Sequence, residues 1–274
     1  MLRAMTAILL LLSIGCSDPA RPAETAEATD SSQTTADARA EEAVCDGRWR
    51  EGEPGLRQRS LCSDGEATLH LVEIDPGLWA LDAVRVAPTT APAVARDNGA
   101  TFAINANFFD PERKPLGVVV SEGTVLQRPH PVSWQSIFYT SSEGNAAIVL
   151  PERWAAVRDD AAMAVQAGPR LVVDGQGTGA TRGNPSLRSG VCLTSDDRVI
   201  FFATTMRRLY DVDEMTDLAA RTEDQGGLGC RDAMLFDGGP SAQMYLADSG
   251  ISIDGDRVPV FVIARPRQEP SDAR

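Results

Sequence analysis

The most chemically suggestive stretch of this sequence reads Ala233-Met-Leu-Phe-Asp237-Gly-Gly-Pro-Ser241-Ala-Gln243. An apolar strand ends here in the carboxylate of Asp237, and Gly238 and Gly239 allow the backbone to turn tightly against whatever lies beside it. The hydroxyl and the amide of Ser241 follow near the same turn. A carboxylate in this setting can act as a nucleophile or as a base that activates water. The plainer interpretation is an Asp-Gly hairpin turn.

Two asparagines, Asn105 and Asn107, lie in a second stretch, Phe102-Ala-Ile-Asn-Ala-Asn-Phe-Phe-Asp110. Residues two apart along a strand point the same way, so the two amides share a face. Among Phe and Ile we expect them to be partly buried, and buried amides need hydrogen-bond partners. The alternative is a pair of turn-forming asparagines at the end of a strand.

Arg188 opens a further predicted strand, directly after Asn184-Pro-Ser-Leu. Its planar guanidinium suits bidentate recognition of a phosphate or a carboxylate. A lone arginine at the start of a strand can equally be a charge on the rim of the surface. Arg170 opens another apolar strand, and there we favour a surface charge over an anion contact.

These stretches, in this order, resemble the phosphodiester glycosidase family over residues 91–265, in a bacterial branch of that family. The most specific match is the last one, Leu228-Gly-Cys-Arg-Asp-Ala-Met-Leu-Phe-Asp-Gly-Gly-Pro-Ser241. Ala106, Phe236 and Pro240 stand where the family pattern has Gly, Leu and Gly. The resemblance implies hydrolysis of a sugar-1-phosphodiester, which releases the sugar and a phosphomonoester.

The residue types fit this chemistry independently of the resemblance. A glycosidase ordinarily needs a carboxylic acid that protonates the leaving alkoxide, together with a second carboxylate. A departing phosphate is already a good leaving group, so one acid becomes unnecessary, and arginine, amide and hydroxyl groups complete the site. No cofactor is expected, although Asp and Asn oxygens can bind a divalent cation. The expected catalytic residues are Asp237 as nucleophile or base, Arg188 as phosphate ligand, Asn105, Asn107 and Ser241; the expected substrate-binding residues are Gly238, Gly239 and Arg265.

Two other functions remain compatible with the sequence. One is a non-catalytic glycan-binding surface lipoprotein on the same scaffold, which binds carbohydrate without releasing a product. The other is a Ser-centred esterase, which requires His70 or His130 close to Ser241. Pro240 precedes Ser241, so this stretch is not a Gly-x-Ser-x-Gly nucleophile elbow.

Composition narrows the class of protein further. The chain has 274 residues, 43% hydrophobic residues and a formal net charge of -13, which is typical of a globular protein. The acidic excess argues against nucleic acid as a partner, because phosphate binding needs a basic face. It also repels an anionic substrate, so arginines must outweigh it locally. With only 2 His, a three-His zinc site is excluded.

The N-terminus has the layout of a bacterial lipoprotein signal, with Arg3, an apolar run and then Gly15-Cys16. We expect residues 1–15 to be removed and Cys16 to carry the lipid. Residues 16–43, with seven acidic residues against two arginines, are expected to form a disordered acidic tether. The protein is then exported to the cell envelope and meets a membrane only through this anchor. The alternative is an ordinary secretory signal that is cleaved nearby.

The other four cysteines, Cys45, Cys62, Cys192 and Cys230, form an even set, which predicts two disulfides in an exported chain. Three pairings are possible. We favour Cys45 with Cys62, as a local link on the entry segment, and Cys192 with Cys230, between two core strands. A metal site is a weaker interpretation, because no Cys-x-x-Cys spacing occurs.

The elements that must position these residues are mostly strands. Short apolar stretches separated by Gly, Asn or Pro predict a single strand-rich α+β domain over residues 44–266, followed by a tail at 267–274. We expect a mixed sheet and two or three helices. Ser195-Asp-Asp197 looks like a hairpin turn. One helix is expected at 91–98, ended by Gly99, and another at 214–224, with Asp213 as its N-cap.

Overall fold

The computed structural model describes residues 45–180 and 183–267. These residues form three β-sheets and three short α-helices, so the predicted α+β class and number of helices are confirmed. The predicted mixed sheet is wrong, because every strand pair in the described part of the chain is antiparallel. The predicted signal, the anchor Cys16, the tether to residue 43 and the tail beyond residue 267 lie outside the described residues.

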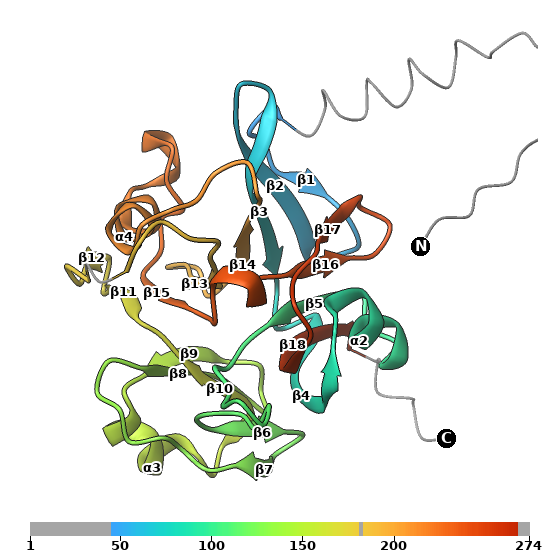
Figure 1. Cartoon of the computed structure of the whole chain (residues 1–274), viewed down its shortest axis with the longest axis vertical. Coiled ribbons are helices and arrows are strands. Elements are labelled where there is room, and N and C mark those ends of the chain that lie inside the picture. The colour runs from blue at the N-terminus through green and yellow to red at the C-terminus, as the bar shows by residue number, and fades with distance from the viewer. Residues whose placement is uncertain (1–44, 181–182, 268–274) are drawn as a thin grey trace, which may run out of the picture. The chain divides into compact units, whose positions relative to one another are not determined.

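The first sheet has eight strands in the order β1-β2-β3-β14-β13-β15-β11-β12 (Figure 1). Its central hairpin, β13–β14, closes at the predicted turn, where Asp197 takes a left-handed φ of 61°. The strands are β1 (Arg50–Glu51), β2 (Leu56–Ser63), β3 (Glu66–Ile74), β11 (Arg170–Val173), β12 (Gln176–Gly177), β13 (Ser189–Leu193), β14 (Val199–Thr204) and β15 (Asp232–Leu235). Asp237 follows the last of these strands by two residues.

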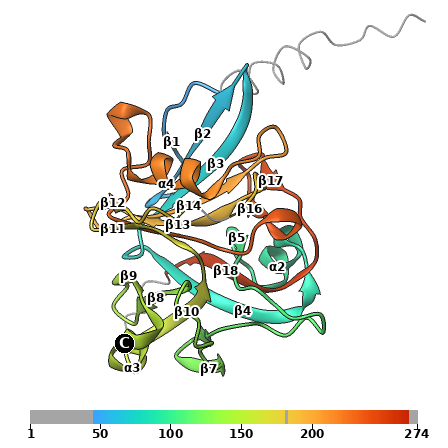
Figure 2. The ribbon, with the colours of Figure 1, turned by 60° about the vertical axis from the view of Figure 1, so that its left-hand side comes forward.

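The other two sheets have five strands each. The second sheet contains, in spatial order, β7 (Thr124–Gln127), β6 (Val119–Ser121), β10 (Ala161–Ala167), β8 (Ser136–Ser141) and β9 (Ala146–Val149). The third contains β17 (Ile251–Ile253), β16 (Met244–Leu246), β5 (Phe102–Asn105), β18 (Val258–Pro266) and β4 (Trp79–Thr89). The strand that ends at Asn105 therefore belongs to a different sheet from the strand that leads to Asp237. In Figure 2 the first sheet lies above β4, β18 and β10.

The ring of Phe201 in β14 lies where side chains of all three sheets meet. Its centroid is 5.0 Å from that of Phe102 in β5, 5.9 Å from Phe138 in β8 and 6.5 Å from Phe236, which follows β15. All four rings are buried. Aromatic side chains bury large apolar areas and pack in tilted or edge-on pairs such as these. The cluster therefore holds β5 and the end of β15 at a set separation.

The longest helix of the described residues, α4 (Val212–Ala220), packs its apolar face against β11 and β12. It begins before the predicted start because Asp211 caps it: the Glu214 carboxylate accepts a hydrogen bond from the Asp211 amide (2.9 Å), in a capping box. It also ends earlier than predicted, because Arg221 is extended. The remaining helical segments are α2 (Ala91–Asp97), α3 (Trp154–Val157) and the 3-10 turns η1 (Pro151–Arg153), η2 (Glu223–Gln225) and η3 (Gly239–Ser241).

The predicted helix at 91–98 is confirmed as α2, and Gly99 follows it with a left-handed φ of 58°. Within residues 45–180 and 183–267, no helix combines the length and the hydrophobicity that a membrane crossing needs.

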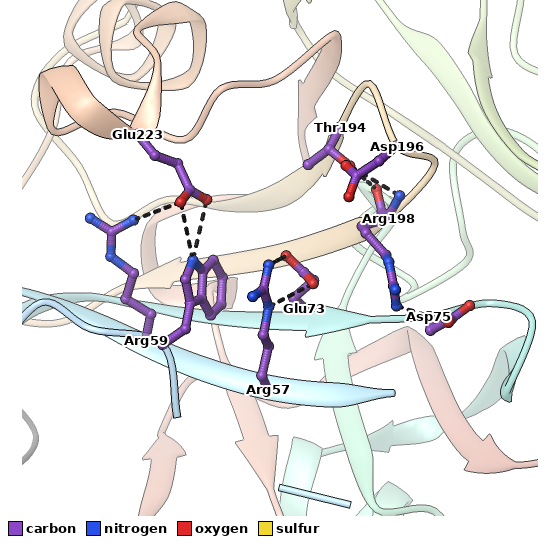
Figure 3. A network of polar contacts seen from close by, with 9 residues as sticks. Arg57, Arg59, Glu73, Asp75, Thr194, Asp196, Arg198 and Glu223 are labelled. Atoms are coloured by element: carbon purple, nitrogen blue, oxygen red, sulfur yellow. Dashed lines mark hydrogen bonds and ion pairs between the residues drawn. The ribbon is translucent and has the colours of Figure 1, made fainter. Parts of the chain in front are cut away.

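Ion pairs between charged side chains link β2 to β3, and link the end of β3 to the start of β14, in the first sheet (Figure 3). Arg57 of β2 donates two hydrogen bonds to the buried Glu73 carboxylate of β3, at 2.7 and 2.8 Å. Arg198, which precedes β14, pairs with Asp75 at 2.8 Å. Because these guanidinium groups are already paired with carboxylates, we assign them a structural role in stabilising the sheet.

Both favoured disulfides are confirmed. Cys45 is bonded to Cys62 and Cys192 to Cys230, with Cα atoms 5.5 and 5.4 Å apart. The second bond ties β13 to the segment that enters β15, and so reaches the strand that carries Asp237.

Replacing Cys192 and Cys230 together by Ala removes a cross-link between residues 38 apart, and we expect the free energy of unfolding to fall by about 4 kcal/mol. The same change at Cys45 and Cys62, which are 17 apart, should cost about 3 kcal/mol, because the shorter loop constrains the unfolded chain less. Urea unfolding of the two double variants measures both losses. A greater loss at the Cys45 pair contradicts this ranking.

Candidate functional site

The backbone of Asp237 is held by two sheets at once. Its amide donates to the carbonyl of Ala106, the residue after β5 (2.9 Å). Its carbonyl accepts from the Asn105 side-chain amide (2.7 Å) and from the Ser189 hydroxyl of β13 (3.1 Å). Three hydrogen bonds therefore position this residue from the first and third sheets.

The carboxyl group of Asp237 is partly buried. Burial raises its pKa to about 6, although hydrogen bonds from the Ser241 hydroxyl and the Gly238 backbone amide favour the ionised form and oppose the shift. The shift is towards the pH range in which enzymes use carboxylates for proton transfer or attack. Ser241 and Gly238 thus act on Asp237 itself.

Asn105 is buried and both ends of its amide are occupied by backbone groups. Its Nδ2 donates to the Asp237 carbonyl (2.7 Å) and its Oδ1 accepts from the amide of Gln243 (3.0 Å), just before β16. The expected burial and the need for partners are confirmed. Because both ends of this buried amide bond to backbone groups, one of them that of Asp237, Asn105 serves to position Asp237.

Asn107 has a different environment, although it is only two residues away. Its Nδ2 donates to the carbonyls of Val118 (3.0 Å) and Leu116 (3.5 Å). Its Oδ1 is buried and has no hydrogen-bond partner among the described residues. A buried acceptor without a partner costs about 1–3 kcal/mol, so this oxygen is a candidate to receive a donor from a ligand.

The turn after Asp237 is built by close backbone packing. A Cβ atom at Gly238 would lie 2.8 Å from the Leu187 carbonyl oxygen, and Gly239 has a left-handed φ of 59°. The Gly239 amide donates to the Leu187 carbonyl (2.9 Å) and the Ser241 amide to the Gly238 carbonyl (3.3 Å). The expectation that this turn offers a row of donors to a substrate is therefore wrong for Gly239 and the Ser241 amide, which are used internally.

Arg188, the expected phosphate ligand, lies beside this turn. Its Nη1 is 3.7 Å from the position of a Cβ at Gly238, while Nε and Nη2 donate to the carbonyls of Tyr210 (3.0 Å) and Asn184 (2.8 Å). No carboxylate of the described residues lies within ion-pair distance of it. Burial lowers its pKa, but a guanidinium remains charged at neutral pH. The more distant Asp211 opposes this shift, so a cation without a carboxylate in ion-pair contact among the described residues adjoins the Asp237 turn.

Arg265 is not part of this site. Its guanidinium pairs with Asp82 (3.4 Å) and Glu122 (3.8 Å). In the third sheet, Asn105 pairs with Phe261, and Arg265 lies four residues further along β18, about 13 Å away at the usual rise of a strand. The structure therefore does not bring this predicted phosphate ligand to Asp237.

The two histidines do not support an esterase. His70 in β3 shares a 2.8 Å hydrogen bond with the Ser60 hydroxyl, and burial lowers its pKa. His130 contributes its backbone amide and carbonyl to the side chain of Gln166. Among the hydrogen bonds of the described residues, neither imidazole contacts Ser241.

Sequence reasoning missed two polar residues at this site, Ser189 and Gln166. Gln166 is buried in β10, where its Oε1 accepts from the amides of Val118 (3.0 Å) and His130 (2.9 Å). Its Nε2 donates to the His130 carbonyl (2.6 Å). The available signal was a polar residue inside the apolar run Ala161–Ala167, which needs partners once it is buried.

Arg170, expected on the surface, is instead mostly buried and pairs with Asp232 at 2.5 Å. Its pairing shows that it serves the fold at the start of β15.

A cavity of about 750 Å³ lies elsewhere, between β2 and α4, and contains none of the predicted catalytic or substrate-binding residues. Within the described ranges of the chain, no group of three or more His, Cys, Asp or Glu side chains is arranged to hold a metal ion.

Solved structures with similar folds are known. The catalytic domain of zebrafish N-acetylglucosamine-1-phosphodiester alpha-N-acetylglucosaminidase, auto-inhibited by its pro-peptide, superposes with a TM-score of 0.63 at 15% identity, over 80% of this chain and 86% of that one. A hypothetical protein from Synechocystis superposes with a TM-score of 0.55 at 17% identity, over 77% of this chain and 62% of that one. The chain thus spans less than two thirds of the Synechocystis protein. At these identities the likeness shows a shared fold.

Sequence comparison identifies the family. No curated protein matches the chain. The sequence model described as phosphodiester glycosidase matches residues 98–270, which is more than half of the chain and includes Asn105, Arg188 and Asp237. The chain therefore belongs to the phosphodiester glycosidase family.

Proposed function

We propose that this protein hydrolyses a sugar-1-phosphodiester at the anomeric carbon and releases the sugar and a phosphomonoester. The observation that carries the proposal is the pairing of groups at one turn: a partly buried carboxylate with a pKa of about 6 beside an arginine that has no carboxylate partner among the described residues. The family match supports the reaction class, and the identity of the sugar is left open.

In the proposed reaction the ionised Asp237 acts at the anomeric carbon in one of two ways. It attacks the carbon directly, and water then hydrolyses the resulting glycosyl ester, so that the sugar takes the hydroxyl and the carboxylate is regenerated. Alternatively it accepts a proton from the water that attacks the carbon, and later releases that proton to solvent. The bond between the anomeric carbon and the phosphate oxygen breaks, and its electron pair stays on that oxygen. Arg188 stabilises the negative charge of the departing phosphomonoester. Because a phosphomonoester leaves readily as an anion, the reaction needs no second carboxylic acid at the site.

The remaining residues of the site prepare Asp237 for this role. Asn105 and Ser189 hold its carbonyl, and Ser241 and Gly238 hydrogen-bond to its carboxylate. A group fixed before the substrate arrives needs no reorganisation during the reaction. Asn105 and Ser189 are therefore positioning residues.

We also propose that the protein is exported and anchored to the bacterial cell envelope through lipid on Cys16. The N-terminal sequence is the main support for this location, and the two disulfides favour an oxidising compartment. Metabolic labelling with a radioactive fatty acid tests the anchor, since Cys16→Ser removes the lipidated side chain.

Asp237→Asn should lower kcat/KM at least about 100-fold on a panel of sugar-1-methyl-phosphodiesters, because the amide cannot attack or accept a proton. Asp248→Asn is the matched control, since Asp248 is an exposed turn residue and Asn tolerates its left-handed φ of 56°. Sugar release and the melting temperature are measured together. A folded Asp237→Asn variant with full activity removes Asp237 from the mechanism, while binding of the substrates without turnover by wild type favours the glycan-binding alternative.

The pH dependence of the wild type reports the ionisation of Asp237. Because the ionised form is the active one, kcat/KM should fall about tenfold per unit below the pKa of about 6 and level off above it. The substrate phosphodiester and Arg188 keep their charges over this range. Initial rates between pH 4.5 and 8 test this, and a rate that instead declines as the pH rises through 6 indicates that Asp237 works as a protonated acid.

Arg188→Ala should lower kcat/KM about 100-fold or more, because the charge on the departing phosphate loses its fixed partner. Arg188→Lys should lose less, since it keeps the charge but not the planar fork. Arg207→Ala provides the control, because Arg207 forms an exposed ion pair with Glu66. Equal rates for Arg188→Ala and the control exclude the phosphate role.

A further inference from the structure

Two aromatic side chains, Phe108 and Trp134, meet next to the site. Their ring centroids are 5.4 Å apart and their planes are inclined at 61°. Phe108 lies two residues after Ala106, whose carbonyl accepts the Asp237 amide. Trp134 remains 51% exposed, although it packs edge-on against Phe108. An exposed tryptophan supported by a second ring offers a rigid apolar surface.

Trp134 directly precedes the chain that enters β8 of the second sheet, and it packs on the segment between β10 and β11. Its carbonyl oxygen would lie 2.8 Å from a Cβ at Gly168, so the chain before β8 packs directly on this glycine. The next residue, Pro169, accepts a hydrogen bond from the Leu235 amide (3.0 Å), two residues before Asp237. Phe108 is thus two residues from a direct contact with Asp237, and Trp134 is linked to the strand before Asp237 through Gly168 and Pro169.

Three residues close to Phe108 or Trp134 in the sequence carry buried polar atoms without partners among the described residues. The atoms are Asn107 Oδ1, beside Phe108, and Gln135 Oε1 and Ser136 Oγ, which follow Trp134 directly. The three residues are at most 3% exposed, and none of these atoms has a hydrogen-bond partner in the described part of the chain. For Asn107 the orientation is set, because its Nδ2 donates to the Val118 carbonyl (3.0 Å) and leaves Oδ1 as an acceptor.

This combination has a definite chemical preference. Phosphate oxygens only accept hydrogen bonds when ionised, so they cannot satisfy the Asn107 oxygen. A sugar supplies hydroxyl donors along its edge and C–H groups on its face, which match unpartnered acceptors beside an aromatic surface. The phosphate requires cationic donors instead, and Arg188, beside the turn that follows Asp237, provides one.

We propose that Phe108 and Trp134 form the surface that binds the sugar ring of the substrate, with the Asn107 side-chain oxygen accepting a hydrogen bond from a sugar hydroxyl. This inference rests on the proposed function for the direction of the substrate: sugar over the aromatic pair, anomeric carbon at Asp237 and phosphate at Arg188.

Gln166 connects the two halves of this surface. Its side chain bonds the Val118 amide, next to the carbonyl that holds Asn107, and both backbone groups of His130, in the chain that leads to Trp134. Gln166 is therefore a positioning residue for the sugar surface. Because Gly117 packs on it, with a Cβ there only 2.8 Å from the Gln166 Cβ, the segment has little room to shift.

The test measures binding of the two halves of the product separately, using the full chain. Free monosaccharides and methyl phosphate serve as probes, with dissociation constants from ligand-observed NMR. Trp134→Ala should weaken monosaccharide binding about tenfold or more and leave methyl phosphate binding unchanged. Arg188→Ala should do the reverse. Trp134→Phe should restore most of the sugar binding, and Met206→Ala, which removes a side chain that is 78% exposed elsewhere, should change neither.

The outcomes separate this inference from the proposed reaction. If wild type binds a monosaccharide and Trp134→Ala loses it, the sugar surface stands even when no phosphodiester is turned over. If wild type hydrolyses a sugar-1-phosphodiester and the folded Trp134→Ala variant keeps the same KM and sugar affinity, the surface is wrong and the reaction stands. Loss of methyl phosphate binding in Trp134→Ala, or no monosaccharide binding by wild type, also overturns the assignment.

Discussion

The side-chain amide of Asn105 joins three strands at one buried point, and the geometry of the site depends on it. Its two hydrogen bonds, to the Asp237 carbonyl and from the Gln243 amide, link the end of β5 to the turn after β15 and to the start of β16. Gln243 extends this link, because its own Oε1 accepts the amide that opens α2 (2.7 Å). Removing one partner leaves a buried polar group unsatisfied, at about 1–3 kcal/mol each. The position of Asp237 is therefore coupled to the stability of the third sheet.

Two charged side chains near Asn105, those of Asp237 and Arg188, have different electrostatic environments. Asp237 is withdrawn from solvent, which raises its pKa, while Arg188 keeps a nearby positive charge that no described carboxylate neutralises. Gly238 lies between them in the turn, where a Cβ atom would be 2.8 Å from the Leu187 carbonyl oxygen and 3.7 Å from Arg188 Nη1. In a chain of net charge -13, the proposed phosphodiester substrate would need such a local positive charge in order to approach.

Asn105 and Asn107 illustrate how one pattern acquires two roles. Asn105 is the last residue of β5 and Asn107 follows two residues later, and both are buried. Asn105 finds backbone partners at the turn after β15 of the first sheet and at the start of β16 of the third. Asn107 bonds the chain just before β6 of the second sheet and finds partners only for its Nδ2. The three sheets meet at the Phe201 cluster, and the two environments arise there because no single sheet supplies both.

Local chemistry in the sequence determined the strand-rich α+β class, the β13–β14 turn, the end of α2 and the Asp237-Gly-Gly turn, because each depends on residues near one another in the chain. The even number of cysteines, together with the expected export, predicted two disulfides, and the favoured one of three possible pairings is the one formed. Only the tertiary structure decided that the sheets are antiparallel, that Arg265 pairs with Asp82 instead of joining the site, and that Asn105 holds Asp237. These outcomes depend on strand register and on hydrogen bonds between residues as far apart as the 132 positions that separate Asn105 from Asp237. Residue periodicity shows that a buried amide needs a partner, but the partner is chosen by how the sheets pack.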